Sequence, residues 1–487
     1  MAQKERYSSK DKQHSFPASL ISHLKFGFYF SLIVFSWFLL LFTCFPSYRH
    51  GPGRPANAAG SHAGHDGVGS SSSLAATAAA ATCPDAIASF YVYDLPPEFN
   101  FVMLASCRTL NIYTDMCPHV TNRGLGQPIP RAPNDGHRRL DGSWYATHQF
   151  IAEMIFHARA ERHPCRTRDP LAAELFYVPF YGGLDASSRF READLAERDR
   201  LAVELADFLE TQPAWRRRAG GDHFLVLGRT AWDFMRNDAD GSSDFGANRL
   251  LHLPAIANMS VLTVERQPWE GRNQFGIPYP SYFHPYSVEE VEEWQDKVRK
   301  SPRTHLFSFV GGPRKGIEKA AVRSAILEQC GASPRCRRVQ CAPGSSECHD
   351  PDQVLEVMMG SEFCMQPPGD SFTRRSVFDA VLAGCVPVFF SEHTAYSQYG
   401  WYLPGEATDY SVFLGGEEKW RRIEAELTTI PAEEVARMRG RVIELIPRLT
   451  YAHPNATGLG FQDAVDVALR RLTQHVRGRF RPAREER

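Results

Sequence analysis

Short apolar segments alternate with amphipathic segments over most of the chain after residue 86. Four apolar segments predict buried strands: FYVYDLP (90–96), ELFYVPFYGG (174–183), HFLVLGR (223–229) and SVLTVER (260–266). Between them, residues 147–162 and 193–212 repeat apolar side chains at helical spacing. Strands that alternate with helices indicate a parallel sheet covered on both faces, so we expect an α/β fold.

A second series of the same kind follows the proline-rich segment IPYPSYFHP. SVEEVEEWQDKVRK (287–300) predicts a helix whose first turn carries a capping box of Ser287 and Glu290. Strand, turn and helix patterns then recur up to residue 450. We therefore expect one α/β lobe at 86–285, a second at 286–450, and a closing helix with a basic tail at 451–487. Two such lobes place ligands at the carboxyl ends of their strands.

The first 85 residues differ in composition from the rest. Residues 26–45, FGFYFSLIVFSWFLLLFTCF, carry no charge and are long enough to span a bilayer. Basic residues precede this run in excess, which predicts a cytosolic tail at 1–25 and an uncleaved transmembrane signal anchor. A cleaved signal peptide is the alternative, but the run is long for one and no obvious cleavage site follows. The Gly-, Ala- and Ser-rich segment 46–85 predicts a flexible lumenal stem, as in many single-pass type II enzymes of the Golgi membrane.

Charge and cysteine usage narrow the class of protein further. Lys and Arg (55) nearly balance Asp and Glu (56), so no overall field favours nucleic acid. Ten of the eleven cysteines follow the predicted anchor, where an oxidising lumen favours disulfides. Cys107 and Cys117 could close a short loop. A second cluster lacks the paired C-x-x-C spacing of zinc sites, so disulfides are expected there too: Cys330, Cys336, Cys341 and Cys348.

Two tripeptides match the acceptor pattern for N-glycosylation. They are NMS at Asn258 and NAT at Asn455. Both suit a lumenal chain, although such tripeptides also occur often by chance.

The turn in FSFVGGPRKG combines glycines with a basic side chain. Gly311 and Gly312 leave a predicted strand, so backbone N–H groups can approach a phosphate there. Arg314 could supply the counter-charge. Two glycines in a strand-to-helix turn are also common without any ligand.

The segment PPGDSFTRRSVFDAVLAGCVPVFF (367–390) strengthens the prediction of an anion site. Gly369 belongs to an exposed turn, Ser371 offers a hydroxyl, and Arg374 presents a planar donor fork suited to diphosphate oxygens. Asp379 could accept hydrogen bonds from a ribose or a sugar. The alternative is a salt-bridged helix start in which Asp379 is only a partner. Two turns of similar chemistry favour a nucleotide-diphosphate site.

Three aspartates follow predicted strands of the first lobe: Asp94, Asp185 and Asp233. An inverting sugar transfer needs a carboxylate or imidazole to take the proton of the acceptor hydroxyl. Each aspartate could instead cap a helix. His148 and His223 are further candidates, although a lone histidine is more often structural.

NDADG (237–241) contains a D-x-D pattern that holds a divalent metal in many enzymes that use sugar nucleotides. Here it lies in a polar turn rather than at the end of an apolar strand. We interpret it as a loop and predict no metal site. Arginines could do the metal's electrostatic work.

Taken in order along the chain, these segments resemble the exostosin-like glycosyltransferases. The plant branch that contains xyloglucan galactosyltransferases is the most similar. The resemblance rests on these motifs: YVYDLPPEFN, ELFYVPFYGGLD, GGDHFLVLGRTAWDF, IPYPSYFHP, FSFVGGPRKG and FCMQPPGDSFTRRSVFDAVLAGCVPVFF. It implies a GT-B fold, an inverting mechanism, a UDP-sugar donor and no metal or other cofactor.

The resemblance also assigns residues. Gly311, Gly312 and Arg314 match the first donor loop. The second donor loop is matched by Gly369, Asp370, Ser371, Arg374 and Asp379. In the first lobe, Asp222 and His223 match a DHF motif, and Asp233 matches an aspartate soon after it. We expect Asp233 to be the general base, with Asp185 and His223 as further catalytic candidates, and Arg375 to be a solvated neighbour of Arg374.

Two departures lie on the acceptor side. His148 stands in WYATHQF where relatives are expected to have Asn or Asp, and GGLDASSRF lacks an aromatic ending. They affect the prediction of the acceptor more than that of the donor.

The resemblance therefore implies a Golgi enzyme that transfers galactose from UDP-galactose to xylosyl side chains of xyloglucan, in a β-linkage. Another UDP-sugar (arabinose or galacturonate), or another polysaccharide acceptor, is the near alternative. A non-catalytic scaffold that assembles with other Golgi glycosyltransferases is the alternative from a different class, although the donor loops look complete.

Overall fold

The computed structural model describes residues 82–481 except 131–141, 238–244, 315, 342–347 and 349. The predicted cytosolic tail, signal anchor and most of the stem fall outside this range. No helix within it is both long and apolar enough to cross a membrane.

The first lobe is built on a six-stranded sheet in the order β2-β1-β3-β4-β5-β6. Every neighbouring pair is parallel. The strands are β1 (Phe90–Val92), β2 (Arg166–Thr167), β3 (Leu175–Val178), β4 (His223–Thr230), β5 (Ser260–Glu265) and β6 (Gln274–Gly276). The four strands predicted from the sequence form the centre of the sheet, and the two that the sequence pattern missed are its short edges.

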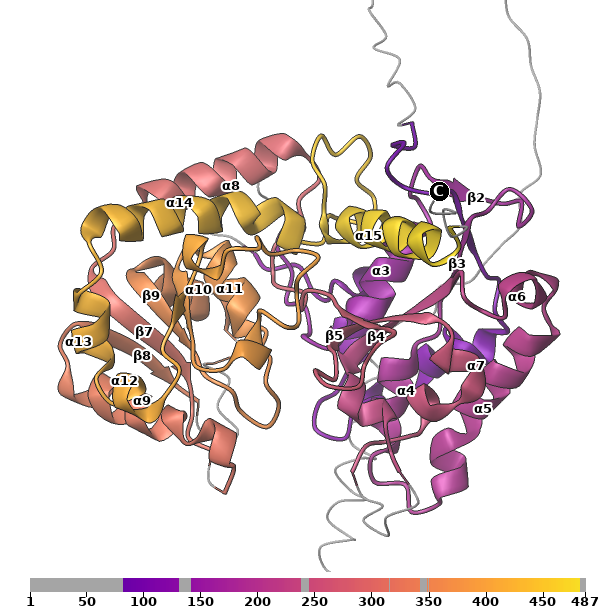
Figure 1. The fold of residues 1–487 in the computed structure, drawn as a ribbon, viewed down its shortest axis with the longest axis horizontal. Coiled ribbons are helices and arrows are strands. Elements are labelled where there is room, and N and C mark those ends of the chain that lie inside the picture. Colours follow the sequence, from indigo (N-terminus) through magenta and orange to yellow (C-terminus); the bar gives the residue numbers. More distant parts are fainter. Residues whose placement is uncertain are drawn as a thin grey trace, which may run out of the picture. The chain divides into compact units, whose positions relative to one another are not determined.

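Helices cover both faces of this sheet (Figure 1). The helices of this lobe are α2 (Cys117–Val120), α3 (Ala152–Ala160), α4 (Gly182–Arg189), α5 (Leu195–Thr211), α6 (Pro213–Arg218) and α7 (Pro254–Ala257). Along β4, Phe224 and Val226 pack in the core cluster that contains α3, whereas Leu225 and Leu227 pack in the cluster with α5. This alternation is the period of two that a strand buried on both faces produces.

The second lobe contains a five-stranded parallel sheet in the order β11-β10-β9-β7-β8. Its strands are β7 (His305–Gly311), β8 (Cys336–Gln340), β9 (Ser361–Gln366), β10 (Val386–Phe389) and β11 (Val412–Phe413). The surrounding helices are α8 (Val288–Lys300), α9 (Val322–Ala332), α10 (Pro351–Met359), α11 (Ser376–Leu382), α12 (Glu417–Trp420), α13 (Ile423–Thr428) and α14 (Ala432–Leu449). The chain runs from β7 to β8 on one side and then returns to β9 on the other, so the order reverses between β7 and β9.

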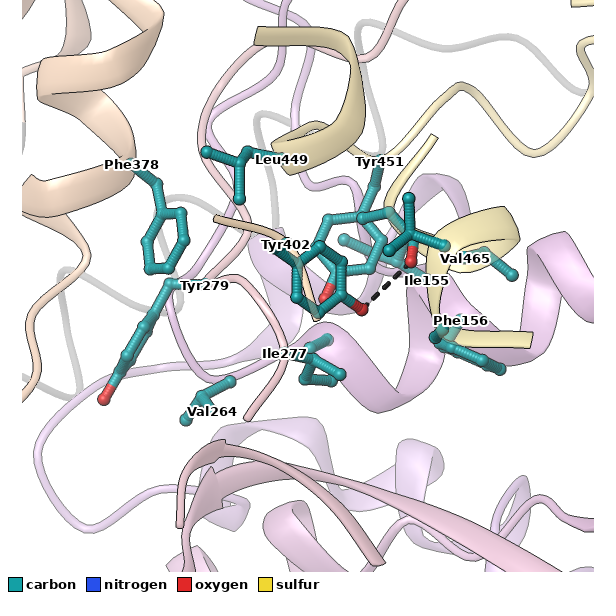
Figure 2. Close-up of a cluster of buried hydrophobic side chains, with 14 of the residues drawn as sticks. Ile155, Phe156, Val264, Ile277, Tyr279, Phe378, Tyr402, Leu449, Tyr451 and Val465 are labelled. Carbon is teal, nitrogen blue, oxygen red and sulfur yellow. Dashed lines mark hydrogen bonds between the residues drawn. The ribbon is translucent and has the colours of Figure 1, made fainter. Parts of the chain in front are cut away.

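The closing helix α15 (Ala464–Arg479) returns to the first lobe. Its N-cap residue, Asp463, accepts a hydrogen bond at 2.8 Å from the buried guanidinium of Arg159, which is part of α3. Figure 2 shows the same junction: Tyr451 and Val465 lie beside Ile155 of α3, and the Tyr402 hydroxyl donates to the Ala464 carbonyl at 3.1 Å. One apolar core therefore includes residues of both sheets and of α15.

Five disulfides connect the ten cysteines of the described part. They are Cys83–Cys165, Cys107–Cys117, Cys330–Cys336, Cys341–Cys348 and Cys364–Cys385. The disulfide interpretation of the Cys330–Cys348 cluster is confirmed, and so is the loop closed by Cys107. Cys364–Cys385 ties β9 to the residue before β10, and Cys385 belongs to the segment 367–390 that the sequence singled out.

The capping box predicted for α8 does not form. Ser287 is the N-cap, but its side chain makes no capping hydrogen bond. The Glu290 carboxylate instead accepts from the Tyr286 backbone N–H at 2.7 Å and from the Ser143 hydroxyl of the first lobe at 2.8 Å. A tertiary partner has taken the place of the local one.

Candidate functional site

The loops that follow β7 and β9 meet at the point where the strand order of the second sheet reverses. In parallel α/β sheets, ligands bind outside the carboxyl ends of the strands at such a point. A cavity of about 380 Å³ lies there. The predicted donor residues that line it are Gly311, Gly312, Arg314, Arg374 and Asp379.

Close packing explains two of the glycines. A Cβ on Gly369 would lie 1.7 Å from Nη2 of Arg374, and one on Gly311 would lie 2.5 Å from Nη2 of Arg323. A side chain at either position would therefore displace the guanidinium that lies against it. Each glycine therefore lets a guanidinium rest against the loop backbone, which fixes where that positive charge is presented.

Arg323, on α9, is the arginine that the sequence patterns missed. It is buried, and its Nε donates to the Gly312 carbonyl at 2.7 Å. Its Nη1 donates to the Pro367 and Pro368 carbonyls at 3.5 and 3.4 Å. One side chain thus ties the first donor loop to the second.

Four guanidinium groups line this cavity; that of Arg375 is paired with Asp379, and the other three belong to Arg314, Arg323 and Arg374. Burial, together with the charges of Arg374 and Arg314, lowers the pKa of Arg323 to about 10. The carboxylate of Asp370 offsets part of the charge, since Arg314 Nε donates to it at 3.1 Å, but both side chains of that pair are largely exposed. Burying a cation without a matching carboxylate is costly, so the cluster favours an anion in the cavity.

The rest of the second donor loop positions Arg374. Its Nη1 donates to the Ser371 hydroxyl and to the Thr373 carbonyl, both at 2.9 Å. The Gly369 N–H donates to the Ser371 carbonyl at 2.9 Å and closes the turn. Gly369, Asp370 and Ser371 therefore support the arginines without lining the cavity themselves.

The expectation that Arg375 is a solvated neighbour is wrong. Its side chain is only 13% exposed, and its Nε pairs with Asp379 at 3.3 Å. Its guanidinium lies over the Tyr282 ring at 3.9 Å and donates to the Thr147 carbonyl of the first lobe at 2.8 Å. Asp379 also accepts from the Ser281 hydroxyl at 2.6 Å, and burial raises its pKa against the influence of Arg375. This pair matches the salt-bridged alternative and joins the two lobes.

Glu265, at the end of β5, is a second residue that the sequence patterns missed. Its buried carboxylate accepts hydrogen bonds from Trp232 Nε1 at 2.8 Å and from the Phe372 and Thr373 backbone N–H groups at 3.3 and 2.7 Å. The Thr373 hydroxyl donates to it as well. A charged residue that ends an apolar strand was the available signal.

Asp233 lies beside this connection. It belongs to the short 3₁₀ helix Ala231–Phe234, one residue after Trp232. Arg229 Nε donates to its Oδ2 at 2.7 Å, and the Thr230 hydroxyl donates to the same oxygen at 3.3 Å. The structure therefore places Asp233 at the carboxyl end of β4, next to the residues that hold the second donor loop.

The other two catalytic candidates lie elsewhere. Asp185, on α4, lines a separate cavity of about 530 Å³ with Arg189, and burial raises its pKa to about 6. His223 is at the opposite, amino end of β4 and is fully buried. Its ring nitrogens contact the Asp222 carboxylate and the Tyr93 hydroxyl, each at 2.8 Å, and burial lowers its pKa although Asp222 opposes this. The buried position of His223 does not support a direct catalytic role. Its packing against Asp222 and Tyr93 explains the DHF motif.

The remaining candidates from the sequence are two possible site residues and the two sequons. His148 lines the donor cavity from the first lobe. Asp94 lines a cavity of about 1160 Å³, whose lining contains none of the other predicted donor or catalytic residues. Of the two sequons, Asn455 is exposed in a loop, whereas the Asn258 side-chain nitrogen donates to the Ala219 carbonyl at 2.6 Å.

Among the described residues, no group of three or more His, Cys, Asp or Glu side chains could hold a metal ion. Most of NDADG (238–241) lies outside the described residues, so its interpretation as a loop stays a prediction. The positive charge at the donor cavity comes from arginines alone in the part of the chain that is described.

Comparison with known proteins gives a consistent result. The chain matches the family described as Exostosin GT47 domain over residues 88–418. It is 59% identical to "Probable xyloglucan galactosyltransferase GT17" of Arabidopsis thaliana, covering 80% of this chain and 82% of that protein. "Xyloglucan galactosyltransferase MUR3" from the same plant is 44% identical, with 79% and 62% covered, and "Xyloglucan galactosyltransferase XLT2" is 42% identical, with 78% and 73% covered. The solved structure of pneumococcal O-GlcNAc transferase GtfA in complex with UDP and GlcNAc aligns with 56% of this chain and 59% of its own. The sequence identity is 10% and the TM-score is 0.23.

Proposed function

Because the chain belongs to the exostosin GT47 family of glycosyltransferases, we propose that it transfers galactose from UDP-galactose to xylosyl side chains of xyloglucan. The names of its relatives support the sugar and the acceptor. The observation that carries the proposal is the cavity at the strand-order reversal, where Arg314, Arg323 and Arg374 meet. This cluster suits the diphosphate of a nucleotide sugar.

The proposed reaction is a single displacement. The oxygen of an acceptor hydroxyl forms a bond to the anomeric carbon of galactose, and the bond from that carbon to the β-phosphate oxygen breaks. UDP leaves with the electron pair, and the acceptor proton goes to the carboxylate of Asp233. Inversion of an α-linked donor gives a β-linked product.

The residues share this work between the lobes. The arginines stabilise the negative charge that develops on the diphosphate as the bond breaks. Glu265 holds the second donor loop against the strand end that carries Asp233. The base and the leaving group are thereby kept in one arrangement, which lowers the entropic cost of reaching the transition state.

We also propose a GT-B arrangement of the two lobes and a mechanism that needs no metal. The two parallel sheets support the first point. The arginine cluster supports the second, since guanidinium groups can neutralise a leaving diphosphate. Transfer that persists in EDTA is the expected result, and its loss would make NDADG a metal-site candidate again.

We place the protein in the Golgi membrane as a single-pass type II enzyme. The apolar run 26–45 and the excess of basic residues before it support this location. The five disulfides are consistent with an oxidising lumen. In intact vesicles, protease should leave the body of a full-length tagged protein uncut, and digestion of that body would contradict the orientation.

A donor panel tests the activity. The purified full-length protein is incubated with a xyloglucan oligosaccharide and, separately, with UDP-galactose, UDP-arabinose, UDP-galacturonate and UDP-glucose. We expect transfer from UDP-galactose at a rate at least tenfold above the others, and a β-linked galactosyl-xylose in the NMR spectrum of the product. Transfer from another donor would change the assigned sugar. No transfer from any donor, together with no UDP binding by calorimetry, would overturn the enzyme assignment.

A further inference from the structure

Four aromatic side chains form a continuous row beside the candidate active site; we call Phe245, Trp232, Trp269 and Phe372 the aromatic row. Trp232 contacts Phe245 and Trp269 with ring centroids 6.1 Å apart in both cases. Trp269 contacts Phe372 at 6.0 Å. All three contacts are edge-to-face. Three of the rings belong to the first lobe, and Phe372 belongs to the second donor loop.

Two members of the row are unusually exposed for large apolar side chains. Trp269 is 62% and Phe245 is 63% accessible to solvent. Burial stabilises large apolar side chains, whereas this fold leaves Trp269 and Phe245, which both contact Trp232, largely in water. Contiguous exposed apolar surface of this kind commonly marks a binding site.

The backbone under Trp269 is held firmly. The side-chain oxygen of the buried Gln267 accepts hydrogen bonds from the backbone N–H groups of Trp269, Glu270 and Gly271. The Gln267 N–H in turn donates to the side chain of Gln274, on β6, at 2.9 Å. The loop after β5 is thus a braced turn that presents Trp269 outward, which lowers the entropic cost of binding against it.

The row runs along the proposed reaction centre. Trp232 precedes Asp233 in the chain, and its indole N–H donates to Glu265. The Glu265 carboxylate accepts hydrogen bonds from the backbone N–H groups of Phe372 and Thr373, the two residues that precede Arg374. A ligand that rests on the row therefore reaches the carboxylate that would take its proton and the loop that would hold the donor.

We propose that the aromatic row is the acceptor subsite and that it binds a chain of neutral pyranose sugars through the apolar faces of their rings. The inference rests on the proposed function and adds where the acceptor binds. A pyranose ring presents a face of C–H groups that packs on an aromatic ring, while its hydroxyls stay in water. The carboxylates next to the row, Glu265 and Asp233, already accept hydrogen bonds from protein groups. The Lys319 ammonium lies 4.5 Å from the centre of the Phe372 ring, so the neutral part of the platform is formed by the exposed rings of Trp269 and Phe245.

The large cavity of about 1160 Å³ is the competing location in the first lobe. It contains an exposed aromatic ring, Phe101, whose centroid lies 5.7 Å from that of the tilted His157 ring. Arg123, Arg162 and Arg168 also line it, which suits an anionic ligand better than a neutral sugar. Phe101 therefore provides a matched aromatic variant for testing which of the two surfaces the acceptor uses.

The test compares Trp269→Ala, Phe245→Ala and Phe101→Ala in the full-length protein, with Tyr113→Ala as the control. Tyr113 is 81% exposed and belongs to neither surface. Two quantities are measured: the KM for a xyloglucan oligosaccharide at saturating UDP-galactose, and the Kd for the same oligosaccharide in the presence of UDP by calorimetry. The binding measurement does not depend on turnover, so it stays informative if the assigned donor is wrong.

We expect Trp269→Ala to raise the acceptor KM and Kd about tenfold or more, and Phe245→Ala to raise them severalfold, as removal of an exposed aromatic anchor does. The Kd for UDP should stay within twofold of the wild-type value. Phe101→Ala and Tyr113→Ala should leave all of these quantities unchanged. Wild-type acceptor affinity in Trp269→Ala, or a loss confined to Phe101→Ala, would overturn the subsite while leaving the proposed activity intact.

Discussion

Arg323 is a buried cation that bonds only to backbone carbonyls in the contacts described. Arg374 and Arg314 lie close enough to lower its pKa further. Such a cluster destabilises the empty protein and is relieved by an anion of two or more charges, because desolvating like charges costs several kcal/mol. The sequence showed Arg314 and Arg374 because both lie in glycine-containing turns. The role of Arg323 could not be predicted from the sequence, because an arginine on an amphipathic helix usually faces solvent.

Arg375 and His223 show a second limit at this scale. Both were judged by their neighbours in the sequence, yet both are defined by partners far along the chain. Arg375 bonds to Thr147, and His223 bonds to Tyr93. Side-chain roles that depend on such distant contacts cannot follow from a motif alone, whereas the position of Gly311 and Gly312 at the cavity follows from their place at the end of β7.

Asp185 gives a prediction about stability and pH. Burial raises its pKa from 3.8 to about 6 in the folded protein, so its stabilising contribution is full below about pH 3.8 and is lost as the pH rises through 6. Asp185→Asn cannot ionise. It should therefore be more stable than wild type at pH 7.5, by about 1–3 kcal/mol, and nearly equal only below about pH 3.8.

Thermal unfolding at several pH values measures this difference. A midpoint about 1–4 °C higher for Asp185→Asn at pH 7.5, narrowing on acidification, is the expected pattern. A variant that is less stable at pH 7.5 would mean that the Arg189 ion pair outweighs the burial of the charge. A large loss of turnover in the same variant would instead restore Asp185 as a candidate base.

Individual elements were predicted well where they are long and buried on both faces. β1, β3, β4 and β5 overlap the four predicted apolar segments of the first lobe, and β7 is the strand predicted before the Gly311 turn. The missed strands β2, β6, β8 and β11 are short or lie at sheet edges, where apolar periodicity is weak. β8 has the sequence CRRVQ, whose adjacent arginines do not resemble a buried strand. The loops that carry the site were predictable because they follow long central strands.

The connection through Glu265 makes a prediction at the scale of these elements. In Glu265→Gln, an NH₂ group takes the place of one carboxylate oxygen and cannot accept a hydrogen bond from a backbone N–H group. The second donor loop therefore loses its anchor on β5. We expect the KM for the UDP-sugar to rise about tenfold and the free energy of unfolding to fall by about 1–3 kcal/mol. Glu98→Gln, at an exposed position, is the matched control. Unchanged kinetics and stability in Glu265→Gln would show that the loop is held by other contacts.

At the scale of the whole molecule, two parallel sheets share one apolar core with α15. The alternation of strands and helices predicted both sheets, and the resemblance predicted the family. The return of α15 to α3 could not be predicted, because it depends on the ion pair of Arg159 with Asp463, about three hundred residues apart in sequence. The inter-lobe contacts of Arg375 and Glu265 have the same character. The contacts of Glu265 bring the loop of residues 372 and 373 against Trp232, which precedes Asp233, so the candidate site includes residues of both lobes.

In the proposed mechanism, the second lobe binds the UDP moiety while Asp233 of the first lobe takes the acceptor proton. The decisive experiment measures the Kd for UDP and the turnover rate in both Arg374→Gln and Asp233→Asn. We predict that Arg374→Gln weakens UDP binding at least tenfold. Asp233→Asn should keep the Kd for UDP within twofold and lower kcat by about 10²- to 10⁴-fold. Full activity in Asp233→Asn, or unchanged UDP affinity in Arg374→Gln, would contradict this division of roles.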